Sequence, residues 1–316
     1  MQTMKAIRIH SFGGPDALVQ EDIAIPQAQD DEIVVRVLAA SVNPVDYKTR
    51  AGQYPAVTQE QLPVVLGRDV CGVIENCGTR AHNMLRKGDP IYALLGRDRG
   101  GYAEYVVVKA TEGAAPPRNL DPVQAAAVPL AGLTAWQGLF DHGGLQAGQR
   151  VLIHGGAGGV GHFAIQFAKA RGAFVATTAS GKDVDFVRGL GADQAIDYKA
   201  ERFEDAVRDL DLVFDLISGE TQERSWAVLK EGGILVSTLG PPDEAKARQH
   251  RARAAGYMAQ PNAAQLREIT GLIEAGKVRP AVEQVFPLAE VAEVAEAHRF
   301  LEGSHPRGKT VLRVVG

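Results

Sequence analysis

A glycine-rich segment in the middle of the chain has the residue types and spacing of a phosphate-binding turn. Residues 150–172 read RVLIHGGAGGVGHFAIQFAKARG, which is an apolar run, a glycine-rich turn and an amphipathic stretch. Gly156, Gly158 and Gly161 fit the pattern G-x-G-x-x-G. In that pattern the successive glycines allow a tight turn, close approach of the backbone to a pyrophosphate, and close packing of a helix on a strand.

The helix that follows this turn can bind a diphosphate without a basic side chain. The first amides of a helix, here those near Gly159, Val160 and Gly161, lack intrahelical partners, and the helix dipole is positive there. The segment has no Gly-Lys-Ser/Thr sequence, which excludes a Walker-type site. The turn therefore predicts a dinucleotide-binding domain.

The residues after the next apolar run indicate which dinucleotide. An NAD site places Asp or Glu there to bind the ribose 2′-hydroxyl, but residues 177–181 read TTASG. The hydroxyls of Thr178 and Ser180, with nearby amides, can receive a 2′-phosphate, and Lys182 can supply charge. Tyr198 can flank the adenine or the phosphate. We therefore predict NADPH, although Lys182 is equally compatible with a solvated lysine and Tyr198 with a half-buried strand residue.

Two patterns of apolar residues divide the chain. Residues 4–108 contain short β-branched runs separated by Gly, Pro and Asn, which predicts a mostly β region. From residue 124, Ala-rich helical stretches alternate with the runs VLIHGG, FVATTAS, AIDY, LVFDLIS and ILVSTLG, which predicts a parallel sheet with crossover helices. The Pro-rich stretch 114–122 marks the boundary, and the C-terminal tail is expected to rejoin the first region.

The composition favours small-molecule chemistry in the cytoplasm. The formal net charge is only -4 and the basic residues are scattered, which argues against nucleic-acid and membrane-surface binding. Two cysteines are too few for a disulfide scaffold. The N-terminal MQTMKAIRIHSF resembles a strand rather than a cleavable leader, and no apolar run reaches the length of a membrane span.

Ordered motifs along nearly the whole chain resemble the medium-chain dehydrogenase/reductase superfamily, in its zinc-free quinone oxidoreductase and enone reductase branch. They are NPVDYKTRAG at 43–52, LPVVLGRDVCGVIE at 62–75, GDPIYAL at 88–94, GGYAEYVVV at 100–108, AAAVPLAGLTAWQGLF at 125–140, HGGAGGVG at 154–161 and GKTVLRV at 308–314. The resemblance implies an α/β protein with two domains. A GroES-like, mostly β catalytic domain would comprise residues 1–118 and 258–316, and a Rossmann domain with a doubly wound parallel sheet would comprise residues 119–257.

The same resemblance allows the catalytic zinc site of the family's alcohol dehydrogenases to be checked by position. The first ligand position is Asn43, the His-Glu position is Arg68-Asp69, and the last falls within Pro129–Ala131. Asp69 alone cannot supply the ligand cluster that zinc needs, so we predict no metal. Without a Lewis acid, conjugated acceptors are favoured, because a quinone or an α,β-unsaturated carbonyl delocalises the arriving charge.

Further residue roles follow from the resemblance. It implies Asn43 beside the nicotinamide, Lys48 facing the substrate and Thr134 near the nicotinamide ring. Lys48 can donate a hydrogen bond or proton to the substrate oxygen, or equally form a surface salt bridge. An aromatic or thioether wall over the acceptor, with ordinary packing as the alternative, is predicted from Tyr47, Tyr54, Tyr257 or Met258. The remaining cofactor candidates are Gly240, Arg307 and Lys309, whereas His154 is expected only to satisfy local hydrogen bonds.

The leading hypothesis is an NADPH-dependent reductase of quinones or enones. A second hypothesis is an NADPH-binding sensor or scaffold protein with little turnover, because no catalytic acid is unambiguous in the sequence. A zinc alcohol dehydrogenase is a distant third. A homodimer formed by pairing an edge strand, with the ILVSTL run at 234–239 as the candidate, is also expected.

Overall fold

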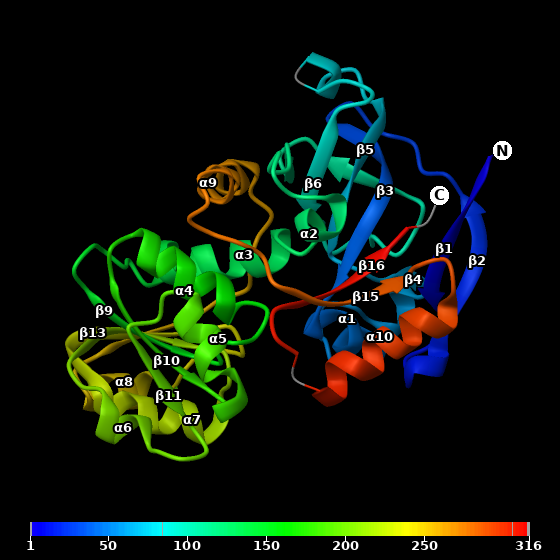
Figure 1. Ribbon diagram of the computed structural model, residues 1–316. Coiled ribbons are helices and arrows are strands. Elements are labelled where there is room, and N and C mark those ends of the chain that lie inside the picture. Colours follow the sequence, from blue (N-terminus) through cyan, green and yellow to red (C-terminus); the bar gives the residue numbers. More distant parts are fainter. Residues whose placement is uncertain (1, 84, 305, 315–316) are drawn as a thin grey trace. The chain divides into compact units, whose positions relative to one another are not determined.

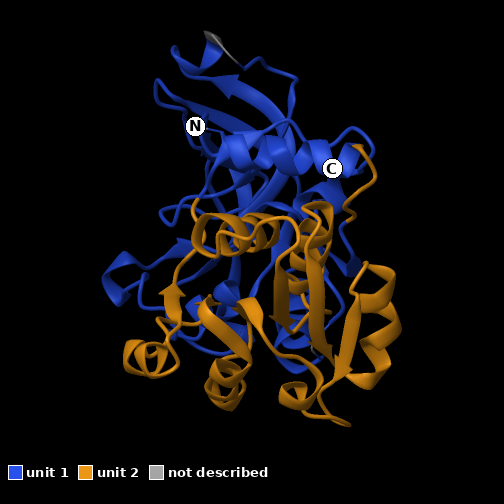
Figure 2. Cartoon of the chain, turned by 90° about the vertical axis from the view of Figure 1, so that its left-hand side faces the viewer, with its two compact units in different colours: residues 1–130, 261–274, 280–316 blue, residues 131–260, 275–279 orange. Residues whose placement is uncertain are grey.

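The computed structural model describes residues 2–83, 85–304 and 306–314 and consists of two compact units (Figure 2). Unit 1 contains residues 1–130, 261–274 and 280–316, and unit 2 contains residues 131–260 and 275–279. The chain therefore passes from unit 1 to unit 2 after residue 130 and returns to unit 1 after residue 260. The sequence analysis placed these two domain limits after residues 118 and 257.

Unit 2 is built on a six-stranded sheet in which every pairing is parallel. Its strands are β9 (Arg150–His154), β10 (Phe174–Ala179), β11 (Gln194–Asp197), β12 (Leu210–Asp215), β13 (Leu229–Ser237) and β14 (Arg253–Gly256). They lie in the order β11-β10-β9-β12-β13-β14, so the chain winds outward in both directions from the centre. Crossovers of one hand place helices on both faces of a sheet wound in this order, and the order with its parallel pairing confirms the predicted Rossmann sheet.

Helices connect these strands and bury the sheet. They are α4 (Gly161–Ala170), α5 (Val184–Gly189), α6 (Phe203–Ala206), α7 (Gly219–Ser225) and α8 (Glu244–Gln249), labelled in Figure 1, and a π-helical segment spans Gln137–His142. Leu152, Val213 and Leu235 on three adjacent strands have no exposed surface. Strands covered on both faces need apolar residues at successive positions, which explains the continuous apolar runs in the sequence.

The outer strand β14 corrects two sequence-based expectations. The segment 241–256, PPDEAKARQHRARAAG, is charged and its composition favours a helix, but within it only α8 is a helix, and Arg253–Gly256 pairs with β13. Its sequence RAAG has no β-branched residue, so it carries no strand signal. The ILVSTL run was predicted as a dimer-forming edge, yet β13 lies between β12 and β14. The sheet ends at β11 and β14 instead, and a dimer stays a prediction.

Unit 1 holds two mainly antiparallel sheets. The smaller has the order β2-β1-β4, from β1 (Thr3–Ile9), β2 (Leu18–Ala24) and β4 (Val64–Val65). The larger has the order β15-β16-β3-β5-β6-β8, with a further strand, β7, paired to β3. Its strands are β3 (Glu32–Val42), β5 (Asp69–Cys77), β6 (Pro90–Leu94), β7 (Tyr105–Lys109), β8 (Gly113–Ala114), β15 (Val282–Pro287) and β16 (Lys309–Arg313). Because β16 pairs with β3, the C-terminal tail rejoins the first region, as expected.

The helices of unit 1 cover this sheet and contribute to its core. They are α1 (Pro44–Arg50), α2 (Pro122–Ala126), α9 (Ala263–Glu274) and α10 (Val291–Ser304), while α3 (Pro129–Trp136) begins in unit 1 and ends in unit 2. Asn43 is the N-cap residue of α1, its backbone amide donates to the Asp46 carboxylate, and Pro44 occupies the first helical position. The sequence NPVD therefore fixes where α1 begins, directly after the central strand β3.

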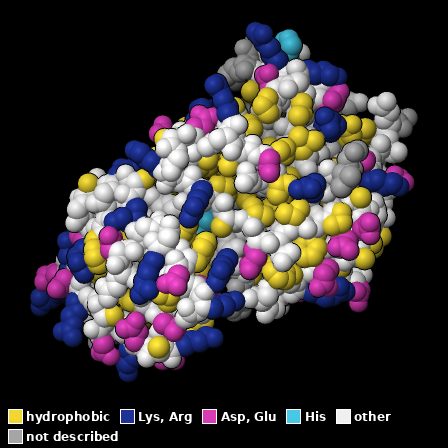
Figure 3. All heavy atoms as spheres, in the orientation of Figure 1, with side chains coloured by type: hydrophobic (Ala, Val, Ile, Leu, Met, Phe, Trp, Pro, Cys, Tyr) yellow, Lys and Arg dark blue, Asp and Glu magenta, His cyan; other side chains and the backbone are white. Residues whose placement is uncertain are grey.

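The surface agrees with the scattered charge of the sequence. On the face shown in Figure 3, basic and acidic side chains are interspersed, and neither sign forms a continuous stripe. Every helix within the described residues is too short or too polar to cross a lipid bilayer.

Candidate functional site

The glycine-rich turn of unit 2 joins β9 to α4 by a tightly packed backbone. Gly155 has a φ of 76°, which glycine adopts without strain. A Cβ on Gly156 would lie 2.0 Å from Thr177 Oγ1, and a Cβ on Gly161 would lie 2.2 Å from the Gly155 oxygen. We assigned the tight turn to Gly156, but the residue with the left-handed conformation is Gly155. Gly156 is needed for packing against β10.

Gly158 differs from these neighbours because the fold does not require it to be glycine. A Cβ there would meet only the Gly155 oxygen, at an ordinary contact distance of 3.5 Å, and its φ is not positive. Within the described residues no side chain caps α4 at Val160. The missing Cβ at Gly158 and the uncapped amides of α4 fit the close approach of a diphosphate. These residues of unit 2 can hold a dinucleotide.

His154 fixes the turn from inside the sheet. It is fully buried, with Nδ1 3.1 Å from Thr178 Oγ1 and Nε2 2.9 Å from Ser225 Oγ. Ser225 donates its own proton to the Thr221 carbonyl, so it must accept from Nε2. Nδ1 therefore accepts from Thr178, whose oxygen in turn accepts from the Gly155 amide. As expected, His154 satisfies local hydrogen bonds, and it connects three elements to the glycine turn.

The predicted 2′-phosphate residues are only partly available in this arrangement. Thr178 is 5% exposed and its hydroxyl donates to His154, so we withdraw it as a phosphate donor. Ser180 donates its hydroxyl to Asp183 Oδ2. A second carboxylate lies nearby, because Asp197 Oδ2 is 2.6 Å from where a Gly181 Cβ would stand. Sequence reasoning found no carboxylate because it considered only residues 177–181, whereas these two come from the following turn and from β11.

Lys182 and Tyr198 remain the most accessible candidates on this side of unit 2. Lys182 is exposed, and Tyr198 has 55% of its surface exposed directly after β11. The ammonium of Lys199 lies 5.9 Å from the Tyr198 ring centre. Their assignment to the 2′-phosphate and adenine stays a prediction.

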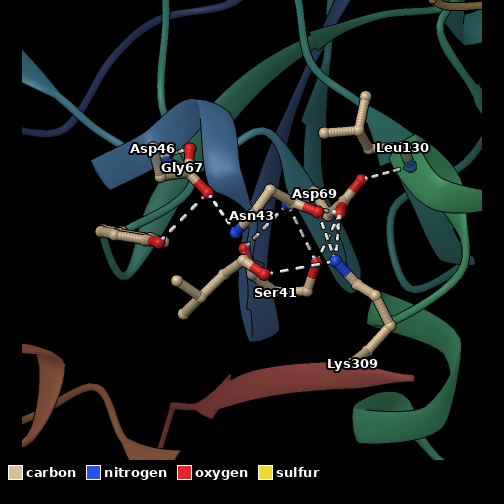
Figure 4. A network of polar contacts seen from close by, with 9 residues as sticks. Ser41, Asn43, Asp46, Gly67, Asp69, Leu130 and Lys309 are labelled. Atoms are coloured by element: carbon tan, nitrogen blue, oxygen red, sulfur yellow. Dashed lines mark hydrogen bonds and ion pairs between the residues drawn. The ribbon is translucent and has the colours of Figure 1, made fainter. Parts of the chain in front are cut away.

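A buried polar network occupies unit 1 where α1 begins (Figure 4). Lys309, 3% exposed, donates from Nζ to Asn43 Oδ1 and to the Val42 carbonyl at 3.2 Å, and lies 3.9 Å from Asp69 Oδ2. Asn43 Nδ2 donates to the same carboxylate oxygen at 2.9 Å. Burial raises the pKa of Asp69 and lowers the pKa of Lys309, and each charge opposes the shift of the other.

Two further donors complete the surroundings of Asp69. Ser41 donates its hydroxyl to Oδ2, and the Leu130 amide donates to Oδ1 at 2.6 Å. Asn43, Asp69 and Leu130, which the sequence analysis assigned to three zinc-ligand positions, are therefore brought together. Both oxygens of Asp69 accept hydrogen bonds and an ammonium stands beside them, so these residues do not fit a zinc ion. No group of three His, Cys, Asp or Glu in the described ranges is arranged for a metal.

Lys309 is placed differently from the sequence-based expectation. We predicted it as a cofactor residue, yet its ammonium lies inside the network of unit 1. A sequence signal was available, because Asp69 and Lys309 are charged residues that directly precede the apolar runs of their strands. Predicting that Asp69 and Lys309 meet would have required knowing how β16 aligns with β3 and how β3 aligns with β5.

A second network extends from Asp46 and was not predicted. Asp46 accepts from the amides of Asn43 at 2.7 Å and Gly67 at 3.2 Å, and from the Tyr102 phenol at 3.3 Å. His298 on α10 joins at Tyr102, and Arg50 donates to its other ring nitrogen. Burial raises the pKa of Asp46 to about 6 and lowers the pKa of His298 to about 3. Asp46 thereby positions the backbone of Asn43.

The other predicted residues lie apart from these networks or have local roles. Lys48 and Tyr54 are half-buried on and just after α1, and Arg307 is exposed with its amide bonded to Glu283. Thr134 is buried in unit 2, where its carbonyl accepts from the Tyr257 phenol. Tyr257 also stacks on His142 at 4.4 Å, which favours the packing interpretation for its ring. Gly240 follows β13 with a φ of 115°.

Comparisons with known proteins agree with this geometry. The family model described as alcohol dehydrogenase GroES-like domain matches residues 29–117, and the one described as zinc-binding dehydrogenase matches residues 190–312. An Arabidopsis thaliana protein named NADPH-dependent alkenal/one oxidoreductase, chloroplastic, is 38% identical over 98% of this chain and 79% of its own length.

Solved structures give the same result. A quinone oxidoreductase from Coxiella burnetii matches with a TM-score of 0.90 and 37% identity, covering 99% of this chain and 100% of that one. The chain belongs to the medium-chain dehydrogenase/reductase superfamily. Within this superfamily, Escherichia coli quinone oxidoreductase complexed with NADPH also matches, with a TM-score of 0.86 and 25% identity over 98% of this chain and 99% of that one. The predicted superfamily, with its GroES-like and Rossmann domains, is confirmed.

Two glycine substitutions should separate binding from folding. Gly158→Ala adds a methyl group that the chain accommodates but that occupies the expected place of the diphosphate, so NADPH affinity should fall at least about tenfold with little change in stability. Gly161→Ala, the matched control, forces a Cβ against the Gly155 oxygen and should lower the melting temperature. Fluorescence titration with NADPH and thermal unfolding check both. Unchanged affinity in folded Gly158→Ala would contradict the assigned turn.

His154 should make unfolding pH-dependent in a defined direction. Burial lowers its pKa from 6.5 to about 4, so between these values the unfolded chain binds more protons than the folded one. The free energy of unfolding is therefore highest above pH 6.5, where His154 is neutral in both states. It falls by up to about 3 kcal/mol as the pH is lowered towards 4. Urea unfolding across this pH range should show a smaller loss of unfolding free energy for His154→Gln than for the wild-type protein. Parallel pH curves for the two proteins would exclude His154 as the source.

The Asp69–Lys309 pair should behave as one unit in a double-mutant cycle. Lys309→Met leaves a buried carboxylate without its cation and should lower the free energy of unfolding by about 3–5 kcal/mol. Adding Asp69→Asn removes that charge, so the double variant should be more stable than the sum of the single changes predicts. Denaturant unfolding of all four proteins measures this, and additivity would show that the two charges do not interact.

Proposed function

We propose that this chain is an NADPH-dependent oxidoreductase that transfers hydride to quinones or α,β-unsaturated carbonyl compounds without a catalytic zinc. The observation that carries the proposal is the Asp69 environment, in which an ammonium and three hydrogen-bond donors surround the carboxylate. Relatives named as alkenal/one and quinone oxidoreductases support the same reaction class.

The cofactor is assigned to unit 2. NADPH supplies the hydride when bound, and the open position at Gly158 and the amides at the start of α4 bind its diphosphate. His154 keeps Gly155 in place through Thr178, so the turn is formed before the cofactor arrives. The NADPH in the name of one relative and in two matching structures supports the choice over NADH.

The acceptor chemistry follows from the residues around Asn43. Hydride reaching the β-carbon of an enone, or the ring of a quinone, moves negative charge to an oxygen that hydrogen-bond donors stabilise. Lys48 is the proposed donor to that oxygen, and a proton from the Lys48 ammonium or from water completes the reduction. Asn43 is held from three sides by Lys309, Asp69 and Asp46, which fixes the start of α1 that carries Lys48.

The alternative, a sensor or scaffold protein with little turnover, is not favoured, because the named relatives are oxidoreductases.

We retain the homodimer and the cytoplasmic location as parts of the proposal. The dimer would pair an outer strand, β14 or β11, since these end the sheet of unit 2.

The decisive experiment measures acceptor-dependent NADPH oxidation with a panel of quinones, alkenals and alkenones. We expect turnover on at least one conjugated acceptor, none on the matched saturated ketone, and no loss after exhaustive treatment with a chelator, because Asp69 has no free oxygen for zinc. Lys48→Met should lower kcat with little change in NADPH affinity. Lys182→Met should weaken NADPH affinity with little change in kcat. NADPH binding without turnover on any acceptor would favour the sensor alternative, and chelator-sensitive activity would exclude the zinc-free mechanism.

A further inference from the structure

The Tyr257 hydroxyl makes polar contacts that the proposed function does not use. Tyr257 directly follows β14, and its phenol donates to the Thr134 carbonyl on α3. The Gly138 amide donates to the same phenol oxygen. In a regular α-helix the carbonyl of residue 134 and the amide of residue 138 bond to each other. The phenol therefore bridges the two polar groups of one helical turn.

The helix is shaped to admit this hydroxyl. A Cβ on Gly138 would lie 2.5 Å from the Tyr257 oxygen and 2.5 Å from Phe214 Cε2, so a side chain at this position excludes the phenol. Directly after Trp136 the α-helix widens into the π-helical segment, in which the amide of residue 143 bonds the Gly138 carbonyl at 3.0 Å. Widened turns of this kind are rare and occur frequently at functional sites.

The sheet of unit 2 in turn holds Tyr257. The Tyr257 amide donates to the carbonyl of Ser237, the last residue of β13, at 3.2 Å. A second connection follows three residues later, where Gln137 Nε2 donates to the Gln260 carbonyl at 2.8 Å and the Gln260 amide donates to Gln137 Oε1 at 2.9 Å. Residues 257–260 thus connect the end of β13 to one turn of α3 through directed hydrogen bonds.

These bonds control a property of α3 that apolar packing controls poorly. Leu133, Ala135 and Leu139 are fully buried and determine how deeply the helix lies in the core. A hydrogen bond has a preferred direction, so the bond to the Thr134 carbonyl restricts rotation of the helix about its own axis. Burial raises the pKa of Tyr257, which keeps the phenol protonated and able to donate. The Thr134 side chain therefore has a defined direction.

The place of this turn within unit 2 connects it with the cofactor. Ligands of open parallel sheets bind at the carboxyl ends of the strands, with the two halves of a dinucleotide on either side of the point where the strand order reverses. Ser180 and Lys182, on the side of β10 and β11, are assigned to the adenosine half. The nicotinamide half then belongs on the side of β12 to β14, where Tyr257 follows β14 and holds Thr134.

We propose that Tyr257 is a positioning residue for hydride transfer, because its hydroxyl holds α3 in the rotation that directs Thr134 at the nicotinamide ring. This inference rests on the proposed function and adds to it a residue that acts through Thr134. The diphosphate and the adenosine are assigned to other parts of unit 2. Loss of the hydroxyl should therefore disturb the nicotinamide and leave most of the cofactor affinity intact.

Tyr257→Phe tests this by removing the hydroxyl and keeping the ring. The gain in NADPH fluorescence on binding, which reports how the nicotinamide ring is held, should be smaller than in wild type, while the dissociation constant of NADPH changes by less than about threefold. 2′-Phospho-ADP-ribose, which lacks the nicotinamide, should bind both proteins equally. With an acceptor that the wild type reduces, kcat should fall at least about tenfold with little change in KM for NADPH.

The matched control is Tyr92→Phe, which removes another buried phenol that donates to a backbone carbonyl. Tyr92 belongs to β6 of unit 1, and its hydroxyl donates to the Leu266 carbonyl at 2.8 Å. Both variants should lower the melting temperature, because each leaves a buried carbonyl without its donor, but Tyr92→Phe should keep the wild-type fluorescence gain and kcat. Gln137→Met cuts the other connection to α3 and should show the Tyr257→Phe pattern more weakly. It replaces Tyr257→Phe in the test if that variant does not fold.

The outcomes separate this inference from the proposed function. A wild-type fluorescence gain and kcat in folded Tyr257→Phe overturn it, as does an equal change of both in Tyr92→Phe, which would indicate a general effect of stability. Weaker binding of 2′-phospho-ADP-ribose to Tyr257→Phe also overturns it, since the hydroxyl would then support the whole cofactor site. If the wild type reduces no quinone or alkenal, the proposed function fails, while the fluorescence comparison still decides whether Tyr257 holds the nicotinamide in place.

Discussion

The buried contact between the Lys309 ammonium, the Asn43 amide and the Asp69 carboxylate is the constraint on which unit 1 depends. Each member lies on a different strand or strand end, since Asn43 follows β3, Asp69 begins β5 and Lys309 begins β16. A buried charge without its partner is strongly unfavourable, so these three segments must meet in one register. The last strand of the chain is thereby tied to the start of α1, where the proposed catalytic residues lie.

This network also bears on the chemistry. In the positions that the resemblance associates with zinc ligands, the chain has an amide, a carboxylate and a backbone amide, and a lysine side chain supplies the positive charge. The ammonium differs from a metal ion because its protons are directed at Asn43 and Val42 and it has no open coordination position for an alkoxide. A reaction in which the acceptor itself delocalises the charge is therefore the better match to this site.

Unit 2 follows the same principle of internal polar contacts that hold a binding surface in place. His154, neutral and fully buried, connects Ser225 on α7, Thr178 on β10 and the glycine turn. The turn is thus fixed by the sheet, while Gly158 and the amides of α4 stay open for a ligand. Asp215 serves the adjacent turn in a similar way by holding Ile217 and the strained Ser218.

The sequence by itself determined the architecture and the nature of the turn, because apolar periodicity, glycine spacing and the ordered motifs are local properties of the chain. It predicted the parallel sheet and the return of the tail to the first region, and the family resemblance implied that Asn43, Asp69 and the segment Pro129–Ala131 occupy one site. Only the tertiary structure decided what depends on partners distant in sequence. It added β14 to the sheet edge, turned Thr178 inward to His154, brought Asp197 towards Gly181, and buried Lys309 beside Asp69. The physical reason is that burial and strand register decide which polar groups meet, and neither is encoded at a single position.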